Sequence, residues 1–349
     1  MAGVRFVSVV VPTYNRAPSL RRLLDALAQQ TYPVDAFEVI VIDDGSSDGT
    51  LGRLGEWSFP FTLRVLEQEH GGPAEARNLG VRHAAGDLIV FVDDDVVPVP
   101  ELLDEHVRSH QAGSDLVVVG PMSPPRAWRR PAWVRWEEDM LQVQYREMLS
   151  GKYPCTPRQF YTANASLSRV RFLRAHGFDP TFKRAEDVEL AYRLRDLGLR
   201  FHFNPRAEVR HYASRSFAAW LRTPYQYGRY DVIMARDKGQ ETLQCATYEF
   251  HERNWLTRSI TRVCVGRPLL SGPSMQLMRV AVRAADRLGV PARVADMLVS
   301  GLFNVTYWQG VCDELGGRRA MTAALAEGAQ LEEKPRLVPI EASSSVPAH

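Results

Sequence analysis

Short apolar runs alternate with segments of helical spacing along the first third of the chain. An apolar run bounded by polar or turn residues predicts a buried strand. Apolar residues three or four positions apart, such as the leucines of residues 19–30, predict a helix. The predicted strands are 6–11, 39–42, 63–66, 88–92 and 116–119, and the predicted helices are 19–30, 72–85 and 100–111. This alternation predicts a Rossmann-like α/β domain with a mostly parallel central sheet flanked by helices.

The amino-acid pattern changes twice in the remainder of the chain. Residues 121–157 are dense in proline, tryptophan and arginine, and we expect an irregular insertion there. Strands over 160–168, 199–203 and 207–212 and a helix over 185–198 then complete a domain of residues 1–215. Residues 216–332 are helical in pattern, clearest over 275–288 and 294–302, and we expect this extension to supply an acceptor site, a dimer contact or a membrane contact. Residues 333–349 have little to bury, and we expect a disordered tail.

Composition excludes few functions. The 349 residues carry a net charge of +2, so nothing demands a nucleic acid partner. No run approaches the roughly 18–20 apolar residues of a membrane span, and the N-terminus lacks the pattern of a signal peptide. The four cysteines form no CxxC pair, which favours neither a zinc site nor a disulfide framework. We expect a cytoplasmic protein, soluble or attached peripherally at the inner face of the membrane.

An acidic cluster ends the predicted strand at 88–92. Asp93, Asp94 and Asp95 follow the apolar run directly, at the edge of the sheet where open α/β folds bind ligands. Three adjacent carboxylates repel one another unless a cation or hydrogen-bond donors compensate their charge. The cluster is therefore a candidate site for a divalent metal. A solvated acidic turn is the alternative interpretation.

The familiar phosphate-binding loops are absent. Neither GxGxxG nor GxxxxGK followed by Ser or Thr comes after the first predicted strand, which leads instead into Pro12, Thr13, Tyr14 and Asn15. A nucleotide would have to be held in another way. A nucleotidyltransferase is a rival interpretation, but it would usually begin with a glycine-rich and basic loop at this point.

Seven motifs in order resemble the family 2 inverting glycosyltransferases of the GT-A fold, over roughly residues 5–215. They are VSVVVPTYNR at 7–16, VIDDGSSDGT at 41–50, GGPAEARNLG at 71–80, FVDDD at 91–95, NASLSR at 164–169, GFD at 177–179 and EDVELAYRLRDLG at 186–198. The resemblance implies inverting, metal-dependent transfer of a sugar from a nucleoside diphosphate sugar to a hydroxyl acceptor, in cell-surface glycan or natural-product glycoside biosynthesis. UDP is the first choice of nucleotide, with dTDP and GDP open, and the lack of membrane spans favours non-processive transfer. A non-catalytic nucleotide-sugar binder or scaffold of the same fold is the alternative from another class.

On the donor side, the resemblance implies a set of nucleotide contacts. Pro12, Thr13 and Tyr14 would cradle the base, and Asp44 would accept a hydrogen bond from a base NH. Arg77 would lie near the nucleotide, paired with phosphate or with a neighbouring aspartate.

The acidic cluster resembles the family's DxD motif. Asp93 would contact ribose or the metal, and Asp95 would ligate Mn2+ or Mg2+ at the diphosphate, because oxygen ligands suit these hard cations. Asp94 would support the nucleotide site from between them. His211 corresponds to a histidine that joins the metal in some members, although a lone histidine is more often structural.

The catalytic base that the resemblance implies is Asp187, in the first turn of the later helix. It would take the proton from the acceptor hydroxyl. Glu186 would begin the helix or orient the site, since acids are favoured in a first helical turn. We also consider Asn164, Glu186 and Trp133 as contacts of the sugar or the acceptor, with a core position as the alternative for the tryptophan.

Overall fold

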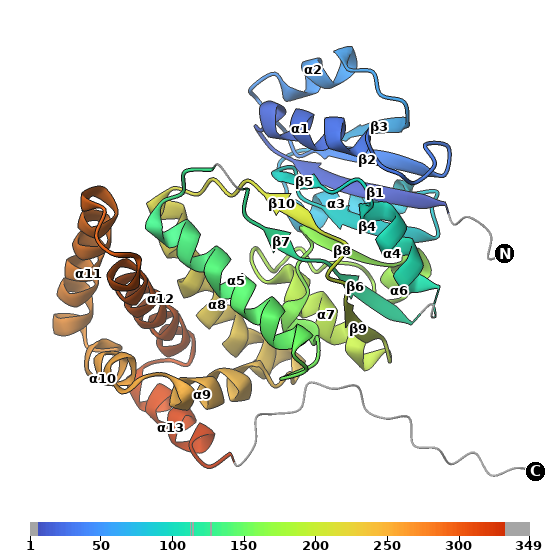
Figure 1. The fold of residues 1–349 in the computed structure, drawn as a ribbon. Coiled ribbons are helices and arrows are strands. Elements are labelled where there is room, and N and C mark those ends of the chain that lie inside the picture. Colours follow the sequence, from blue (N-terminus) through green and yellow to red (C-terminus); the bar gives the residue numbers. More distant parts are fainter. Residues whose placement is uncertain (1–5, 112, 114, 126–127, 332–349) are drawn as a thin grey trace, which may run out of the picture. The chain divides into compact units, whose positions relative to one another are not determined.

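A computed structural model describes residues 6–331 except 112, 114, 126 and 127 (Figure 1). The chain forms two compact units. The first contains residues 6–123 and 145–211, and the second contains residues 124–144 together with 212–331. The change at residues 211–212 lies near the expected boundary at 215, but residues 124–144 group with the C-terminal helices, which we did not expect. The tail predicted at 333–349 lies outside the described residues.

The first unit is organised around a mixed sheet. Within the described residues this sheet has seven strands in the order β3-β2-β1-β4-β8-β6-β9. The strands are β1 (Val7–Thr13), β2 (Phe37–Asp43), β3 (Thr62–Glu67), β4 (Leu88–Val92), β6 (Leu116–Val119), β8 (Asn164–Ser168) and β9 (Arg200–Phe203). All neighbours are parallel except β8, which runs antiparallel to β4 and β6. The prediction of a mostly parallel sheet flanked by helices, followed by a helical region, is confirmed.

Helices cover both faces of this sheet. One face packs against α3 (Pro73–His83), α6 (Arg169–Arg174) and α7 (Glu186–Asp196), through side chains such as Val81, Phe172 and Leu190. On the other face, α4 (Leu102–His110) brings His106 and His110 within hydrogen-bond distance of the Ser166 hydroxyl on β8. The remaining helices of the unit are α1 (Ala17–Leu27) and α2 (Thr50–Glu56), with a 3-10 turn, η1, at Pro157–Gln159. Alternating strand residues therefore face two helical layers, which explains why both faces are apolar.

A second, small sheet was not predicted. It joins β5 (Val96–Pro98), β10 (Val209–His211) and β7 (Met122–Ser123) in the order β5-β10-β7. The antiparallel pairing of β10 with β5 places His211 opposite Val96. The histidine is thereby brought next to the residue that follows Asp95, although the two are far apart in sequence.

Two sequence predictions are wrong in this region. The segment 121–157 is not irregular throughout, because Ala132–Leu149 forms the long helix α5. Its prolines stand before residue 132 and after residue 153, and the backbone oxygen of Pro131 accepts from Val134 and Arg135 in the first turn. The proline density thus marks the ends of a helix. The strand expected over 160–168 begins only at Asn164, because η1 and a turn precede it.

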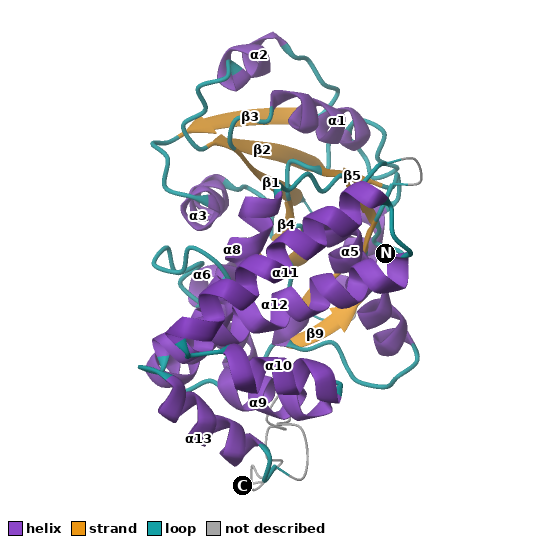
Figure 2. Cartoon of the chain, turned by 90° about the vertical axis from the view of Figure 1, so that its left-hand side faces the viewer, coloured by secondary structure: helices purple, strands orange, loops and turns teal. Residues whose placement is uncertain are grey.

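The second unit is built from helices. They are α8 (Phe217–Lys238), α9 (Thr242–Glu252), α10 (Trp255–Cys264), α11 (Pro268–Leu288), α12 (Ala292–Glu314) and α13 (Arg318–Gly328), with the first part of α5 (Figure 2). Trp220 of α8 is fully buried in one core cluster and Trp308 of α12 is buried in another. Among the described residues, no helix is both long and apolar enough to cross a membrane.

Helices α8 and α12 touch backbone to backbone. A Cβ atom on Gly310 would lie 2.1 Å from the backbone oxygen of Tyr225, and one on Gly228 would lie 2.1 Å from that of Tyr307. A hydrogen bond also connects the two helices, in which the Tyr225 hydroxyl donates to the Asp313 carboxylate at 2.9 Å. Since a backbone oxygen cannot swing aside as a side chain does, this crossing tolerates no side chain at either glycine.

We therefore expect Gly310→Ala to destabilise the protein by about 1–3 kcal/mol, the usual cost of overpacking. Gly301→Ala is the matched control on the same helix, because nothing lies within 4 Å of its added Cβ. The control should be neutral or stabilising by about 0.5–1 kcal/mol, since alanine is the better helix former. Thermal unfolding midpoints of the two variants measure the difference. Equal midpoints would contradict a backbone contact at Gly310.

Candidate active site

Loops that follow three adjacent strands meet at one edge of the first unit. Strand β1 pairs with both β2 and β4, and Thr13 at its end lies opposite Asp43. Asp93, Asp94 and Asp95 follow β4 directly. The carboxyl ends of parallel strands lie at the same edge, so the acidic cluster and the Asp43–Asp44 loop flank the end of β1.

A buried arginine ties the acidic cluster to helix α7. The Arg77 side chain on α3 is only 4% exposed, and its Nη2 donates to Asp93 Oδ1 at 2.6 Å while its Nη1 donates to Glu186 Oε1 at 3.1 Å. Burial alone would lower the pKa of Arg77, but the charges of Asp93 and Glu186 raise it, so the guanidinium stays charged. The two acids lie on segments 93 residues apart in sequence, and this one side chain holds them together.

Asp187 follows Glu186 in the first turn of α7. The residue before them, Ala185, has a left-handed φ of 58°, which starts the helix abruptly. The Asp187 carboxylate accepts from the backbone NH of Val188 at 2.8 Å. Burial and the nearby charge of Glu186 raise the pKa of Asp187 to about 7, against the opposing effects of the Val188 NH and Arg77. A carboxyl group with such a pKa can accept a proton near neutral pH.

Asp94 is held from inside the domain. The Thr13 hydroxyl donates to its Oδ2 at 2.7 Å, and Arg16 donates to its Oδ1 at 3.0 Å. Its side chain is only 6% exposed, and burial raises the pKa of Asp94 to about 6. The residue fastens the cluster to the end of β1.

Asp95 faces the side chains of Arg16 and His211. Arg16 donates to its Oδ2 at 2.7 Å, and the Nε2 atom of His211 lies 3.5 Å from its Oδ1. Burial alone would raise the pKa of Asp95, but His211 and Arg16 lower it to about 2. Within the described residues, no group of three His, Cys, Asp or Glu side chains is arranged to hold a metal ion by itself.

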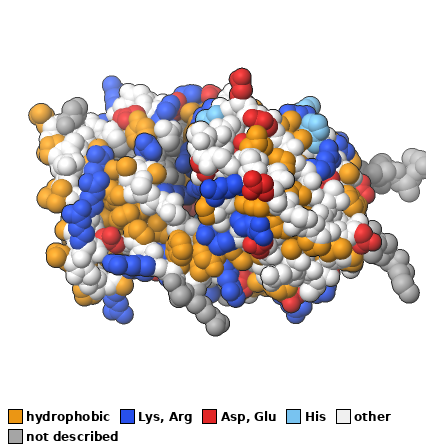
Figure 3. Space-filling model, turned by 90° about the horizontal axis from the view of Figure 1, so that it is seen from above, with side chains coloured by type: hydrophobic (Ala, Val, Ile, Leu, Met, Phe, Trp, Pro, Cys, Tyr) orange, Lys and Arg blue, Asp and Glu red, His pale blue; other side chains and the backbone are white. Residues whose placement is uncertain are grey.

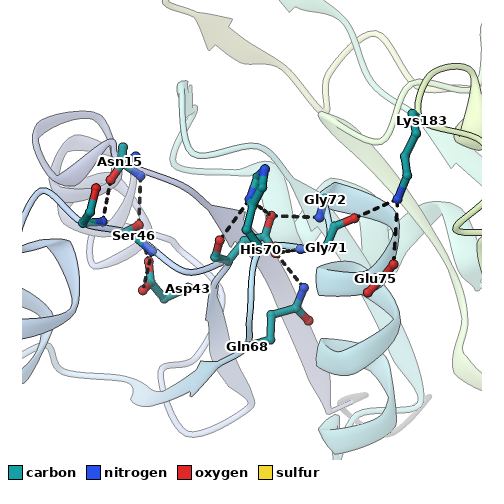
Figure 4. A network of polar contacts seen from close by, with 11 residues as sticks. Asn15, Asp43, Ser46, Gln68, His70, Gly71, Gly72, Glu75 and Lys183 are labelled. Atoms are coloured by element: carbon teal, nitrogen blue, oxygen red, sulfur yellow. Dashed lines mark hydrogen bonds and ion pairs between the residues drawn. The ribbon is translucent and has the colours of Figure 1, made fainter.

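The Asp44 carboxylate organises the neighbouring loop, whose Gln68, His70, Gly71 and Gly72 are labelled in Figure 4. Its Oδ1 accepts from Gln68 Nε2 at 2.7 Å and from the backbone NH of Gly71 at 2.9 Å. Its Oδ2 accepts from the NH of Gly72 at 3.0 Å and lies 2.9 Å from His70 Nδ1. The side chain is 5% exposed. Three hydrogen bonds from the chain itself thus reach the Asp44 carboxylate in this conformation, whereas the base NH that the resemblance implies as its partner would come from a ligand.

An exposed aromatic pair lies beside this loop. The ring of Tyr14, which is 43% exposed, stacks on His70 with centroids 4.2 Å apart and planes at 27°. Figure 4 also shows Asn15 bonded to the turn at Ser46, which in turn bonds to Asp43. Opposite them, Lys183 reaches the Gly71 carbonyl oxygen at 3.2 Å. The loops after β1, β2 and β3 are thus joined into one structured rim.

Comparisons with known proteins agree with this arrangement. Residues 8–174 match the sequence model described as glycosyl transferase family 2. These residues belong to that family. The validoxylamine A glucosyltransferase of Streptomyces hygroscopicus subsp. jinggangensis is 32% identical over 222 residues, 56% of this chain and 53% of that protein. The poly(ribitol-phosphate) beta-N-acetylglucosaminyltransferase TarS of Staphylococcus aureus is 37% identical over 115 residues, 32% of this chain and 20% of that protein. The chain thus spans about half the length of the first curated relatives it matches, or less.

Solved structures show the GT-A fold. The mannosyltransferase PcManGT from Pyrobaculum calidifontis, in complex with GDP-Man and Mn2+, has a TM-score of 0.60 at 22% identity, with 88% of each chain covered. Residues 1–349 of S. aureus TarS, in complex with UDP, have a TM-score of 0.54 at 21% identity, with 86% of this chain and 90% of that chain covered.

Two residues expected to contact the sugar or acceptor are not available for that role. Asn164 is fully buried, donates to the carbonyl oxygens of Pro121 and Ala207 at 3.2 and 2.7 Å, and lies 3.0 Å from His106 Nε2. It supports the family 2 domain from inside. Trp133 belongs to the second unit, where it is buried against Phe217. Trp133 therefore occupies a core position, which was the alternative interpretation.

Arg16, Gln68 and His70 are site residues that sequence reasoning missed. Arg16 pairs with Asp94 and Asp95, whereas Gln68 and His70 contact Asp44. Arg16 ends the motif at residues 7–16, so a charge-matching argument against the acidic cluster could have found it. Gln68 and His70 lie in the polar connection between β3 and α3. The sequence has no helical or strand periodicity there from which the course of the backbone could be predicted.

Removal of the Arg77 charge should destabilise the family 2 domain strongly. Arg77→Met keeps the aliphatic stem but leaves Asp93 and Glu186 without their cation, which should cost about 3–5 kcal/mol. Arg82→Met, on the exposed side of the same helix, is the matched control and should cost less than about 0.5 kcal/mol. Urea unfolding followed by circular dichroism measures both variants. Similar losses in the two would show that the buried pairing has no special weight.

Proposed function

We propose that this chain is an inverting, metal-dependent and non-processive glycosyltransferase that moves a sugar from a nucleoside diphosphate sugar to a hydroxyl acceptor. The observation that carries the proposal is the junction made by Arg77, which holds the acidic cluster after β4 against the helix turn that bears Asp187. One group of residues can thus serve the leaving diphosphate and the other can serve the attacking hydroxyl. Family membership supports sugar transfer as the reaction class.

Asp187 is the proposed general base. Its carboxylate takes the proton of the acceptor hydroxyl while that oxygen forms a bond to the anomeric carbon. The bond from the anomeric carbon to the phosphate oxygen breaks on the opposite side, and its electron pair leaves with the nucleoside diphosphate. A single displacement of this kind inverts the anomeric centre and needs no protein nucleophile. Glu186 is a positioning residue, since its carboxylate is held by Arg77.

The donor nucleotide is proposed to lie along the rim formed by the loops after β1, β2 and β3. Tyr14 offers an exposed aromatic ring for a base, beside Pro12 and Thr13. Asp44 sets the course of the Gly71–Gly72 turn. UDP is the first choice of nucleotide, with dTDP and GDP open, because TarS has been solved with UDP and PcManGT with GDP-Man.

A divalent cation, Mn2+ or Mg2+, fits the residues around Asp95. The pair of Asp95 and His211 offers a carboxylate oxygen and an imidazole nitrogen at 3.5 Å from each other, and Asp93 is a further carboxylate of the same loop. These donors suit either cation if the diphosphate of the donor completes the ligand set. When bound, the metal would neutralise charge on the departing diphosphate. Mn2+ in the PcManGT structure supports this choice.

The acceptor class follows from the relatives alone. One relative is named as a validoxylamine A glucosyltransferase and another as a poly(ribitol-phosphate) beta-N-acetylglucosaminyltransferase. We therefore keep natural-product glycosides and cell-surface glycans as the two acceptor classes. The role of the second unit in acceptor binding stays a proposal.

Asp187→Asn should abolish turnover while it leaves donor binding intact. Loss of the base should lower kcat by about 10²–10⁴-fold. Turnover is measured as nucleoside diphosphate release from UDP-glucose, UDP-GlcNAc or GDP-mannose with Mn2+, with water as acceptor. Donor binding is measured as the rise in melting temperature with the same donors. Asp196→Asn, at the exposed other end of α7, is the control and should keep full turnover.

Three results of this experiment would each change the proposed function. Full turnover in Asp187→Asn would remove Asp187 as the base. Donor binding without turnover in the native chain would favour a non-catalytic nucleotide-sugar binder. No shift with any of these donors, with or without Mn2+, would overturn the donor assignment.

The pH dependence of kcat/KM should show an acidic limb set by Asp187. The pKa of this carboxyl is raised to about 7, and a general base must be deprotonated to act. The rate should therefore fall as the pH drops below about 7, approaching a tenfold loss per pH unit. Donor hydrolysis measured across a pH series gives the profile. A profile that stays flat into mildly acidic solution would contradict the assignment.

A further inference from the structure

Helices α10 and α11 and the start of α12 present large apolar side chains to solvent within the second unit. We define this apolar surface by six exposed residues: Trp255, Leu269, Leu277, Val280, Leu288 and Met297. Trp255 is 71% exposed and Leu269 is 90% exposed. Side chains of this size, gathered on neighbouring helices, indicate an interaction site more than single exposed residues do.

The arrangement on α11 shows that this exposure is systematic. With 3.6 residues per turn, Leu269, Leu277, Val280 and Leu288 fall within about 100° of the helix circumference. On the opposite side, Val282 and Ala285 are buried in the core of the unit. Helix α11 therefore has one apolar side that packs inside its own unit and a second that does not, whereas an ordinary surface helix has only the first.

The charge on these helices is one-sided. Residues 253–297 contain eight arginines, two aspartates and no lysine or glutamate, which leaves a net charge of +6. Both aspartates are used toward α5: Asp286 accepts from the backbone NH of Ala132 at 2.7 Å, and Asp296 lies 3.7 Å from Arg135. Within the described part of the chain, none of the eight arginines is paired with a carboxylate. Figure 3 shows exposed hydrophobic and arginine or lysine side chains beside one another at its left side.

We propose that α10, α11 and the start of α12 dock this chain on the surface of a membrane that contains anionic phospholipids. Leucine and tryptophan side chains would enter the boundary between headgroups and acyl chains, while guanidinium groups would pair with lipid phosphates. Tryptophan suits such a boundary because its ring is apolar and its NH is polar. This inference does not depend on the proposed transferase reaction.

A second copy of the chain is a poorer occupant of the same surface. In a symmetric dimer the same patch meets itself, so arginines of one copy that have no carboxylate partner would face those of the other. Like charges brought together across an interface cost free energy. An anionic membrane satisfies both the apolar residues and the arginines at once.

The test is sedimentation of the full chain with vesicles. One set contains phosphatidylcholine alone, and the other contains two parts phosphatidylcholine to one part phosphatidylglycerol. We expect binding to the anionic vesicles and little to the neutral ones, with a loss of binding as NaCl is raised. Light scattering on the same samples without vesicles should report a monomer.

Two variants separate the apolar contribution from the charge. Leu269→Ser/Leu277→Ser removes two exposed leucines, and Arg287→Glu/Arg293→Glu reverses two exposed charges. Each should weaken binding at least about tenfold. Val170→Ser, which removes a 66% exposed apolar residue of the first unit, is the control and should bind as the native chain does.

Three outcomes would overturn the proposal. The first is no binding of the native chain to anionic vesicles. The second is full binding by the leucine variant, which would mean attachment by charge alone. The third is a native dimer that the leucine variant converts to a monomer, which would mean that a second copy covers the surface.

Discussion

The buried guanidinium of Arg77 is the interaction on which the active-site region depends. It lies in α3, and it contacts one acid from the loop after β4 and another from the first turn of α7. Desolvated charges of one sign cannot be brought together without a cation that is fixed among them. Arg77 supplies that cation from inside the domain, so the chain itself holds the acidic loop against α7.

The same crowding gives chemically identical side chains different properties. Asp94 and Asp95 are neighbours in sequence, yet the pKa of Asp94 is raised to about 6 by burial while that of Asp95 is lowered to about 2 by His211 and Arg16. On α7, burial and the charge of Glu186 raise the pKa of Asp187 to about 7. The burial of each carboxyl and its distance from neighbouring basic and acidic side chains therefore decide whether its pKa rises or falls. A motif written as a string of acids does not contain this information.

Much of the first unit could be predicted from the sequence because its strands are continuous apolar runs and its helices have a clear period. The same apolar runs also predicted that the acidic cluster lies directly after a strand, because the run at residues 88–92 ends at Asp93. The small sheet was missed because β5, β7 and β10 are very short and pair only through tertiary contacts. Helix α5 was missed because the prolines at its ends outweighed the proline-free stretch between them. Asn164 lies within a motif of the family, but the pattern could not show that all of its polar atoms are used inside the fold.

The stacked pair of Tyr14 and His70 has a consequence for any planar ligand that uses the same face of the tyrosine. Such a ligand must first displace the imidazole, so only the fraction of molecules with the pair open is competent to bind. The apparent dissociation constant then exceeds the intrinsic one by the reciprocal of that fraction. His70 also contacts Asp44, so the cost of opening includes a polar contact as well as a stacked ring. The loop after β3 thus acts as an internal competitor, and its own stability sets the concentration at which the rim is filled.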